Sequence, residues 1–144
     1  GFRVAIATNQ SGLGRGLFSA DDLQAIHTRL RQMVEERGGS IAGIFFCAHT
    51  PDEGCSCRKP ATGLLRVIEE ALGESASGAA FIGDSLRDLQ AARAFGCKAM
   101  LVRTGRGRAT LAALQSGEAR FEAWEALPVF ADLAAAASSI LRNR

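Results

Sequence analysis

Short apolar runs alternate with stretches of helical periodicity along most of this chain, and this alternation limits the possible folds more than any other feature. Four apolar runs of strand length are predicted strands, at residues 2–7, 41–47, 79–82 and 98–102. Helices are predicted between them, at residues 20–37, 62–72 and 86–95. This order predicts an α/β fold: a Rossmann-like three-layer sandwich with a mostly parallel sheet and functional residues at the carboxyl ends of the strands.

The C-terminal third of the chain is predicted to be mainly helical. An Ala- and Leu-rich helical segment follows residue 107, a short edge element lies near residues 121–124, and a last helix spans roughly residues 128–141. The chain has 144 residues, of which 47% are hydrophobic. This size and composition predict one globular domain over residues 1–144.

Charge and hydropathy argue against two classes of partner. The net charge is only +2 and the arginines are scattered, so no nucleic-acid partner is expected. No apolar stretch approaches the roughly 20 residues of a membrane span, and the first residues lack the pattern of an export signal. Because the cysteines are also expected to stay reduced, we predict a cytoplasmic protein.

One polar, turn-rich loop contains four soft metal ligands: Cys47, His49, Cys55 and Cys57. A Pro and a Gly between the two pairs allow the loop to turn back and surround a tetrahedral ion, for which zinc is the best match. Four ligands leave no open position, so the predicted zinc is structural. The alternatives are free thiols in an ordinary loop, or a strained disulfide between Cys55 and Cys57. A rigid loop would aim Arg58 and Lys59, which follow directly.

Polar groups also follow the predicted strands. Residues 8–10 (Thr-Asn-Gln) offer a hydroxyl and N–H groups, Lys59 a cation, and Asp84 and Asp88 two carboxylates. Donors and a cation together with carboxylates predict a site for phosphate and magnesium. Each residue also has a purely structural explanation, for example Asp84 as the N-cap of the next helix and Asp88 as a first-turn acid.

These residues resemble motifs of the haloacid dehalogenase superfamily of phosphohydrolases, with Thr8, Lys59 and the segment 83–88 in the expected order. More narrowly, the metal loop, residues 57–60 and residues 101–105 resemble the D-glycero-D-manno-heptose bisphosphate phosphatases. The histidinol-phosphate phosphatases share the metal loop and are the alternative. The resemblance implies hydrolysis of the C7 phosphate of D-glycero-D-manno-heptose 1,7-bisphosphate, a cytoplasmic step in lipopolysaccharide biosynthesis.

The resemblance also implies roles for single residues. Thr8 and Lys59 would bind and neutralise the phosphoryl group, and Asp84 would hold Mg²⁺ with support from Asp88. Further contacts to the sugar phosphate would come from Asn9, Gln10, Arg58, Arg103 and Arg106. We expect a monomer at full length. The alternative to an enzyme is a non-catalytic, zinc-stabilised domain that binds phosphorylated ligands.

Two departures from the superfamily pattern stand out. Its members use an Asp-x-Asp motif upstream of Thr8 as nucleophile and general acid, forming an aspartyl-phosphate, and this chain has no such motif. We therefore expect a chain that is incomplete at its N-terminus, lacks the first, central strand of the sheet and is inactive as it stands. The second departure is Ser85, where relatives often have Lys.

Overall fold

The computed structural model describes residues 1–142, and these residues form two compact units that meet in sequence between Glu74 and Ser75. Every strand in both units is parallel to its neighbour, as the alternation of strands and helices predicts. No helix in the described part of the chain is both long and apolar enough to cross a membrane.

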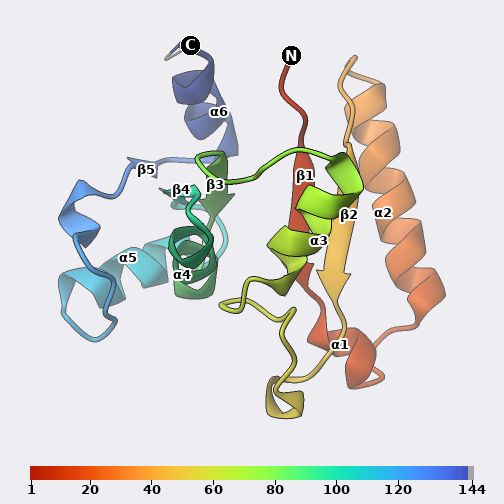
Figure 1. The fold of residues 1–144 in the computed structure, drawn as a ribbon, viewed down its shortest axis with the longest axis horizontal. Helices are drawn as coiled ribbons and strands as arrows, with labels where there is room; N and C mark the ends of the chain where they lie inside the picture. Colours follow the sequence, from red (N-terminus) through yellow and green to blue (C-terminus); the bar gives the residue numbers. More distant parts are fainter. Residues whose placement is uncertain (143–144) are drawn as a thin grey trace. The chain divides into compact units, whose positions relative to one another are not determined.

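The first unit contains a two-stranded sheet. Strand β1 (Ala5–Asn9) pairs with β2 (Gly43–Cys47), from Ala5 opposite Gly43 to Asn9 opposite Cys47. Helix α3 (Gly63–Leu72) packs on both strands and buries Leu64, Leu65 and Ile68 (Figure 1). The unit also holds the short helix α1 (Ser11–Gly14), the long helix α2 (Ala20–Glu35) and the 3₁₀ turn η1 (Pro51–Glu53).

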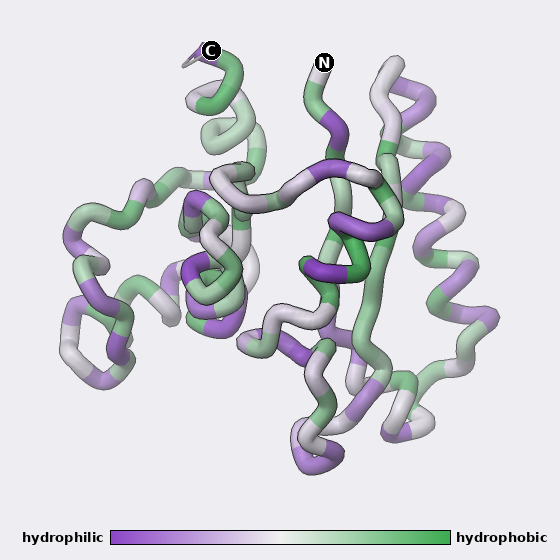
Figure 2. Tube along the Cα trace, in the orientation of Figure 1, coloured by the Kyte–Doolittle hydropathy of each residue, from purple (hydrophilic) through white to green (hydrophobic). Residues whose placement is uncertain are grey.

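Helix α2 begins where the sequence predicts. The Ser19 hydroxyl accepts the Asp22 N–H at 3.1 Å, and the Asp22 carboxylate accepts the Ser19 N–H at 2.8 Å, which satisfies two N–H groups at the helix start. Polar residues line most of α2, whereas β2 is largely apolar (Figure 2). The first strand begins later than predicted, at Ala5, and continues to Asn9, because its ladder follows the extent of β2.

The second unit contains a three-stranded sheet in the order β3 (Ala80–Gly83), β4 (Lys98–Val102) and β5 (Val129–Phe130). Three leucines from different elements form its buried centre: Leu89, Leu101 and Leu114. The helices are α4 (Leu86–Phe95), α5 (Gly107–Gln115) and α6 (Leu133–Arg142), with a 3₁₀ turn η2 (Trp124–Ala126).

The edge strand of this sheet lies further along the chain than predicted. The carbonyls of Pro128 and Phe130 accept N–H groups from Leu101 and Arg103, both at 2.9 Å, so this segment extends along β4. The prediction of an edge element at 121–124 was therefore wrong, and the predicted last helix is confirmed as Leu133–Arg142 but begins five residues later than residue 128. Hydrogen bonds to β4, which are distant in sequence, fix the strand here.

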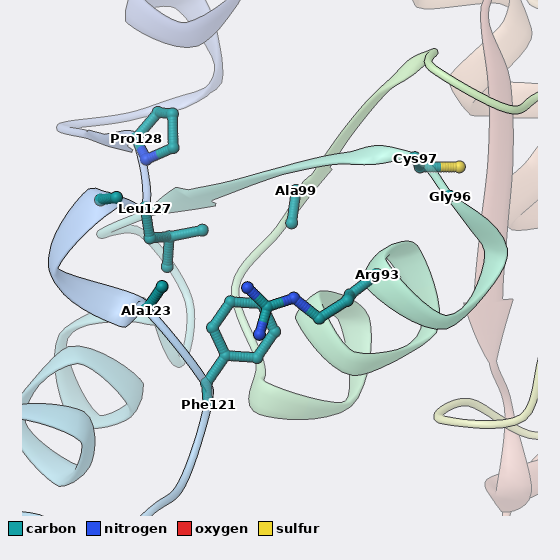
Figure 3. Close-up of a pocket in the computed structure, with 9 residues that line it drawn as sticks. Arg93, Gly96, Cys97, Ala99, Phe121, Ala123, Leu127 and Pro128 are labelled. Carbon is teal, nitrogen blue, oxygen red and sulfur yellow. The ribbon is translucent and has the colours of Figure 1, made fainter.

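A hollow of about 300 Å³ lies in the second unit, lined by α4, the start of β4 and residues 121–128 (Figure 3). The Arg93 guanidinium lies 4.3 Å from the centre of the Phe121 ring and 3.7 Å from the Glu122 carboxylate. Arg93 thus covers an aromatic side chain that packs against the leucine centre. These residues precede β4 and β5, so they lie away from the carboxyl ends of those strands.

Replacing Leu89 by Ala is expected to lower the free energy of unfolding by about 2–5 kcal/mol, because this side chain is fully buried. Trp124, the chain's single tryptophan, packs against the same cluster, so its fluorescence during urea unfolding measures the loss. Leu133→Ala is the matched control, since Leu133 is 61% exposed, and it should change stability by less than about 0.5 kcal/mol. Equal losses in the two variants would contradict this description of the core.

Candidate active-site clusters and metal-binding loop

The four predicted metal ligands converge in the first unit. Their ligand atoms all lie within 4.8 Å of one another. Cys57 Sγ lies 3.0 Å from Cys47 Sγ and 3.2 Å from His49 Nδ1, and Cys47 Sγ lies 3.5 Å from Cys55 Sγ. Zinc–sulfur bonds of about 2.3 Å place the sulfurs of a tetrahedral site roughly 3.8 Å apart. The cluster can therefore hold a metal ion after small adjustments.

Local backbone features turn the loop back on itself. The Thr50 N–H and hydroxyl donate to the Glu53 carboxylate, at 2.5 and 3.0 Å, and Gly54 follows with φ +60°. Both arms of the loop also lie close against glycines. A Cβ on Gly14 would lie 2.5 Å from the Ala48 carbonyl oxygen. A Cβ on Gly63 would lie 2.4 Å from the Ser56 carbonyl oxygen. Only glycine fits at these two positions, because backbone atoms cannot move aside cheaply.

Two of the thiols differ in acidity. Burial acts to raise the pKa of Cys55, but hydrogen bonds from the Arg58 N–H and from neighbouring groups outweigh it and bring the pKa to about 7. Burial raises the pKa of Cys57 to about 12, and contact with Cys47 and Cys55 adds to the rise because thiolates repel each other. A cation at the centre of the cluster removes that repulsion.

Lys59 is tied to the carboxyl-terminal half of β1 through Ala7 and Asn9. The Asn9 side chain binds the Lys59 main chain twice: Oδ1 accepts the N–H at 3.1 Å, and Nδ2 donates to the carbonyl at 3.2 Å. Lys59 is buried, and its ammonium donates to the Ala7 carbonyl at 2.6 Å. Lys59 therefore binds both residues that flank Thr8 in β1, and a phosphate-binding role for Thr8 and Lys59 stays a prediction.

Asn9 and Gln10 are both engaged within the protein. The Gln10 N–H donates to the Cys47 carbonyl at 2.7 Å, and Gln10 Nε2 donates to Thr8 Oγ1 at 3.0 Å. Since Thr8 Oγ1 accepts this bond, its own proton can be donated to another acceptor. Contact of Asn9 and Gln10 with a substrate stays a prediction.

In the second unit, Asp84 follows the end of β3 and is half-buried. One carboxylate oxygen, Oδ2, accepts the Arg106 N–H at 2.9 Å, and the Asp84 carbonyl accepts the Thr110 hydroxyl at 2.8 Å. The Asp84 N–H donates to Asp88 Oδ2 at 3.3 Å. The residue is therefore held by its side chain, its carbonyl and its N–H.

The N-cap of α4 is Ser85. Its hydroxyl accepts the Asp88 N–H at 3.3 Å, and the buried Asp88 carboxylate accepts the Ser85 N–H at 3.1 Å and hydroxyl at 2.8 Å. Asp84 is not the cap, so the structural explanation considered for this carboxylate is wrong. Asp88 does act as a first-turn acid, and it also holds the Asp84 main chain.

The three arginines predicted to contact substrate occupy two settings. Arg58 Nη1 donates to the His49 carbonyl at 3.3 Å, which ties this arginine to the metal loop. Arg103 and Arg106 are exposed, in the segment after β4. Substrate contacts by these three side chains stay predictions.

Two residues that contact Asp84 were not found from the sequence. Thr110 lies on α5, 26 positions after Asp84, and Gly105 lies in the loop before that helix. A helical Thr has no local signature for such a contact. Gly105 ends the segment 101–105 that carries part of the resemblance, but nothing in the sequence indicated its close approach to Asp84.

Both units place their candidate chemistry after the carboxyl ends of parallel strands. This arrangement is typical of α/β proteins, whose ligand sites generally lie outside the carboxyl ends of the strands. The family model described as HAD-hydrolase-like matches residues 56–136, more than half of the chain. The chain belongs to the HAD-like hydrolase family.

Similar proteins cover nearly the whole chain. It is 47% identical over 142 residues to D-glycero-beta-D-manno-heptose-1,7-bisphosphate 7-phosphatase of Pseudomonas aeruginosa, a match that covers 99% of the chain and 75% of that relative. The phosphatase of the same name from Bordetella bronchiseptica is 47% identical over 140 residues, or 97% of the chain and 74% of the relative.

A solved structure agrees with this result. The crystal structure of D,D-heptose 1,7-bisphosphate phosphatase from B. bronchiseptica, complexed with magnesium and phosphate, matches with a TM-score of 0.88 and 44% identity. That match covers 99% of this chain and 75% of the other.

The Glu53 carboxyl is expected to titrate below its ordinary pKa of 4.5, because the Thr50 N–H and hydroxyl donate to its charged form. The stability that the Glu53 carboxylate gives the loop is then complete above about pH 4.5, and it is lost as the pH falls through the lower pKa of the folded state. Carbon-detected NMR titration measures the midpoint. Thr50→Ala should raise it toward the ordinary value, whereas Ser56→Ala, a hydroxyl deletion elsewhere in the loop, should leave it unchanged. A midpoint at or above 4.5 in the parent protein would contradict the hydrogen-bonded geometry.

Proposed function

We propose that the protein carrying this chain is a magnesium-dependent phosphatase that removes the C7 phosphate of D-glycero-D-manno-heptose 1,7-bisphosphate. The observation that carries the proposal is the setting of Asp84. Its carboxylate follows a strand end, does not cap the next helix, and accepts a hydrogen bond from the Arg106 N–H. Carboxylates held in this way at strand ends are suited to a hard divalent cation. The names of the relatives support the choice of substrate.

Thr8 and Lys59 handle the phosphoryl group. Thr8 donates its hydroxyl proton to a phosphoryl oxygen, because its oxygen already accepts a bond from Gln10. The Lys59 ammonium supplies positive charge beside it, and Asn9 fixes the main chain of that lysine. Both groups stabilise the charge that develops on the phosphoryl oxygens during transfer.

Magnesium fits the carboxylate side of the site. Asp84 would hold it, with Asp88 supporting Asp84 through the main chain. When bound, the cation neutralises phosphoryl charge and orients the group for in-line attack. The magnesium and phosphate named for the Bordetella structure support this assignment.

The nucleophile is not among these 144 residues, since none of them forms an Asp-x-Asp motif. Neither Asp84 nor Asp88 can replace it, because the first is assigned to the cation and the second is buried in the helix cap. We therefore propose the activity for the chain joined to such a motif, and no phosphate release from the 144 residues alone.

Three arginines are our candidates for the residues that select the substrate. We assign Arg58, Arg103 and Arg106 to the far side of the substrate, where guanidinium groups suit a second phosphate. The named relatives favour heptose bisphosphate over histidinol phosphate. Comparing phosphate release from the two substrates separates them, and release from neither would favour a non-catalytic phosphate-binding domain.

We assign zinc to the loop cluster as a structural ion. Three sulfurs and one imidazole nitrogen are the ligand set that zinc prefers, and four ligands leave no place for water. Such a site requires reduced thiols, which supports a cytoplasmic location and the role in lipopolysaccharide biosynthesis that the substrate implies.

The purified protein is expected to carry about one zinc per chain, measured by elemental analysis after purification without chelators. Cys55→Ser should lower both the zinc content and phosphatase activity, because Arg58 and Lys59 lose their rigid support. Cys97→Ser is the control, since Cys97 lies outside the cluster and donates to the Ala76 carbonyl. Less than about a tenth of an equivalent of zinc in the parent protein would rule out the assignment.

Asp84→Asn is expected to reduce phosphate release about a hundredfold or more, because it removes one negative charge from the magnesium site. Excess magnesium should restore only part of the activity. The stability of α4 should hardly change, since Ser85 is the cap. Turnover close to that of the parent protein at ordinary magnesium concentrations would place the metal site elsewhere.

A further inference from the structure

The N-cap residue and the first turn of α5 hold Asp84. The Arg106 N–H donates to Asp84 Oδ2 and the Thr110 hydroxyl donates to the Asp84 carbonyl, at 2.9 and 2.8 Å. The Arg106 carbonyl accepts the Thr110 N–H at 2.9 Å. The two donors are therefore linked through one turn of main chain and act on Asp84 as a unit.

Gly105 allows this approach. It has φ +57°, a conformation that favours glycine, and a Cβ built on it would lie 2.1 Å from Asp84 Oδ2. A side chain at this position would have to displace the carboxylate. Any residue other than glycine at this position would therefore push the Asp84 carboxylate out of its place beside the Arg106 N–H.

The hydrogen bonds leave one carboxylate oxygen for a ligand. Oδ2 is committed to the Arg106 N–H, and Oδ1 accepts no hydrogen bond from the described residues. A carboxylate with one oxygen held by the protein has a fixed orientation, so its other oxygen meets a cation with little loss of rotational freedom.

We propose that Thr110 is a positioning residue for the magnesium site, acting together with Gly105 by fixing the orientation of Asp84. This inference rests on the proposed function, which assigns Asp84 to magnesium. Thr110 touches neither substrate nor cation. Its hydroxyl holds the main chain from which the carboxylate extends, so its loss weakens cation binding without changing the ligand set.

The test compares three variants of the protein that carries this chain. Thr110→Val removes the hydroxyl and keeps the shape of the side chain, and Thr110→Ser retains the hydroxyl. Ser116→Ala is the matched control, because it deletes a hydroxyl at the C-cap of the same helix that donates to the Ala113 carbonyl at 3.2 Å. Mn²⁺ is the probe, with its affinity measured by electron paramagnetic resonance and thermal unfolding followed in parallel.

Thr110→Val should weaken Mn²⁺ binding by about 10- to 100-fold, the usual effect of removing a group that orients a metal ligand. Its magnesium requirement for turnover should rise, and activity should recover at saturating magnesium. Thr110→Ser and Ser116→Ala should bind Mn²⁺ like the parent protein. Gly105→Ala offers a second variant, with the same direction of change.

The outcomes separate this inference from the proposed function. If Asp84→Asn abolishes Mn²⁺ binding but Thr110→Val and Gly105→Ala bind it normally, the positioning role is wrong and the metal site stands. If Asp84→Asn itself binds Mn²⁺ normally, the assignment of Asp84 fails. Equal weakening in Thr110→Val and Ser116→Ala would mean that a general loss of helix stability is responsible, which also overturns the positioning role.

Discussion

The paired hydrogen bonds between the Asn9 amide and the Lys59 main chain are the constraint on which the first unit depends. They join the end of β1 to the segment that leaves the metal loop. The Gln10 N–H binds the carbonyl of Cys47, where the loop begins. Both ends of the loop are thus attached to the end of one strand. The Cys/His cluster, Lys59 and the Thr8 hydroxyl are consequently held in fixed positions relative to one another.

Asp88 has a comparable part in the second unit. A single buried oxygen, Oδ2, accepts both donors of Ser85 and the N–H of Asp84. A Cβ on Gly83 would lie 2.3 Å from the Asp88 Cβ, so the end of β3 can approach the helix only as glycine. Stability and function are therefore hard to separate at Asp88, because a change there would disturb the helix cap and the presentation of Asp84 together.

Local spacing allowed much of this structure to be predicted. The four candidate ligands lie within eleven consecutive residues, 47–57, so the sequence alone could group them around one ion. The periods of the apolar residues predicted the order of strands and helices. The positions of β5 and Thr110 could not be predicted, because each depends on contacts with residues more than 20 positions away. The role of Asn9 at the site stays a prediction, and its hydrogen bonds to the Lys59 main chain could be found only from the three-dimensional structure.

Ser85 shows how one position can serve two competing demands. Its hydroxyl caps α4, and replacing such a cap costs about 0.5–2 kcal/mol. A lysine there would place a positive charge at the start of α4 but would give up the cap. Chains with serine at this point gain a firmly anchored helix and must draw positive charge from elsewhere. The exposed side chains of Arg103 and Arg106 carry no such duty, so evolution can exchange charge after β4 while the helix that follows Asp84 stays anchored.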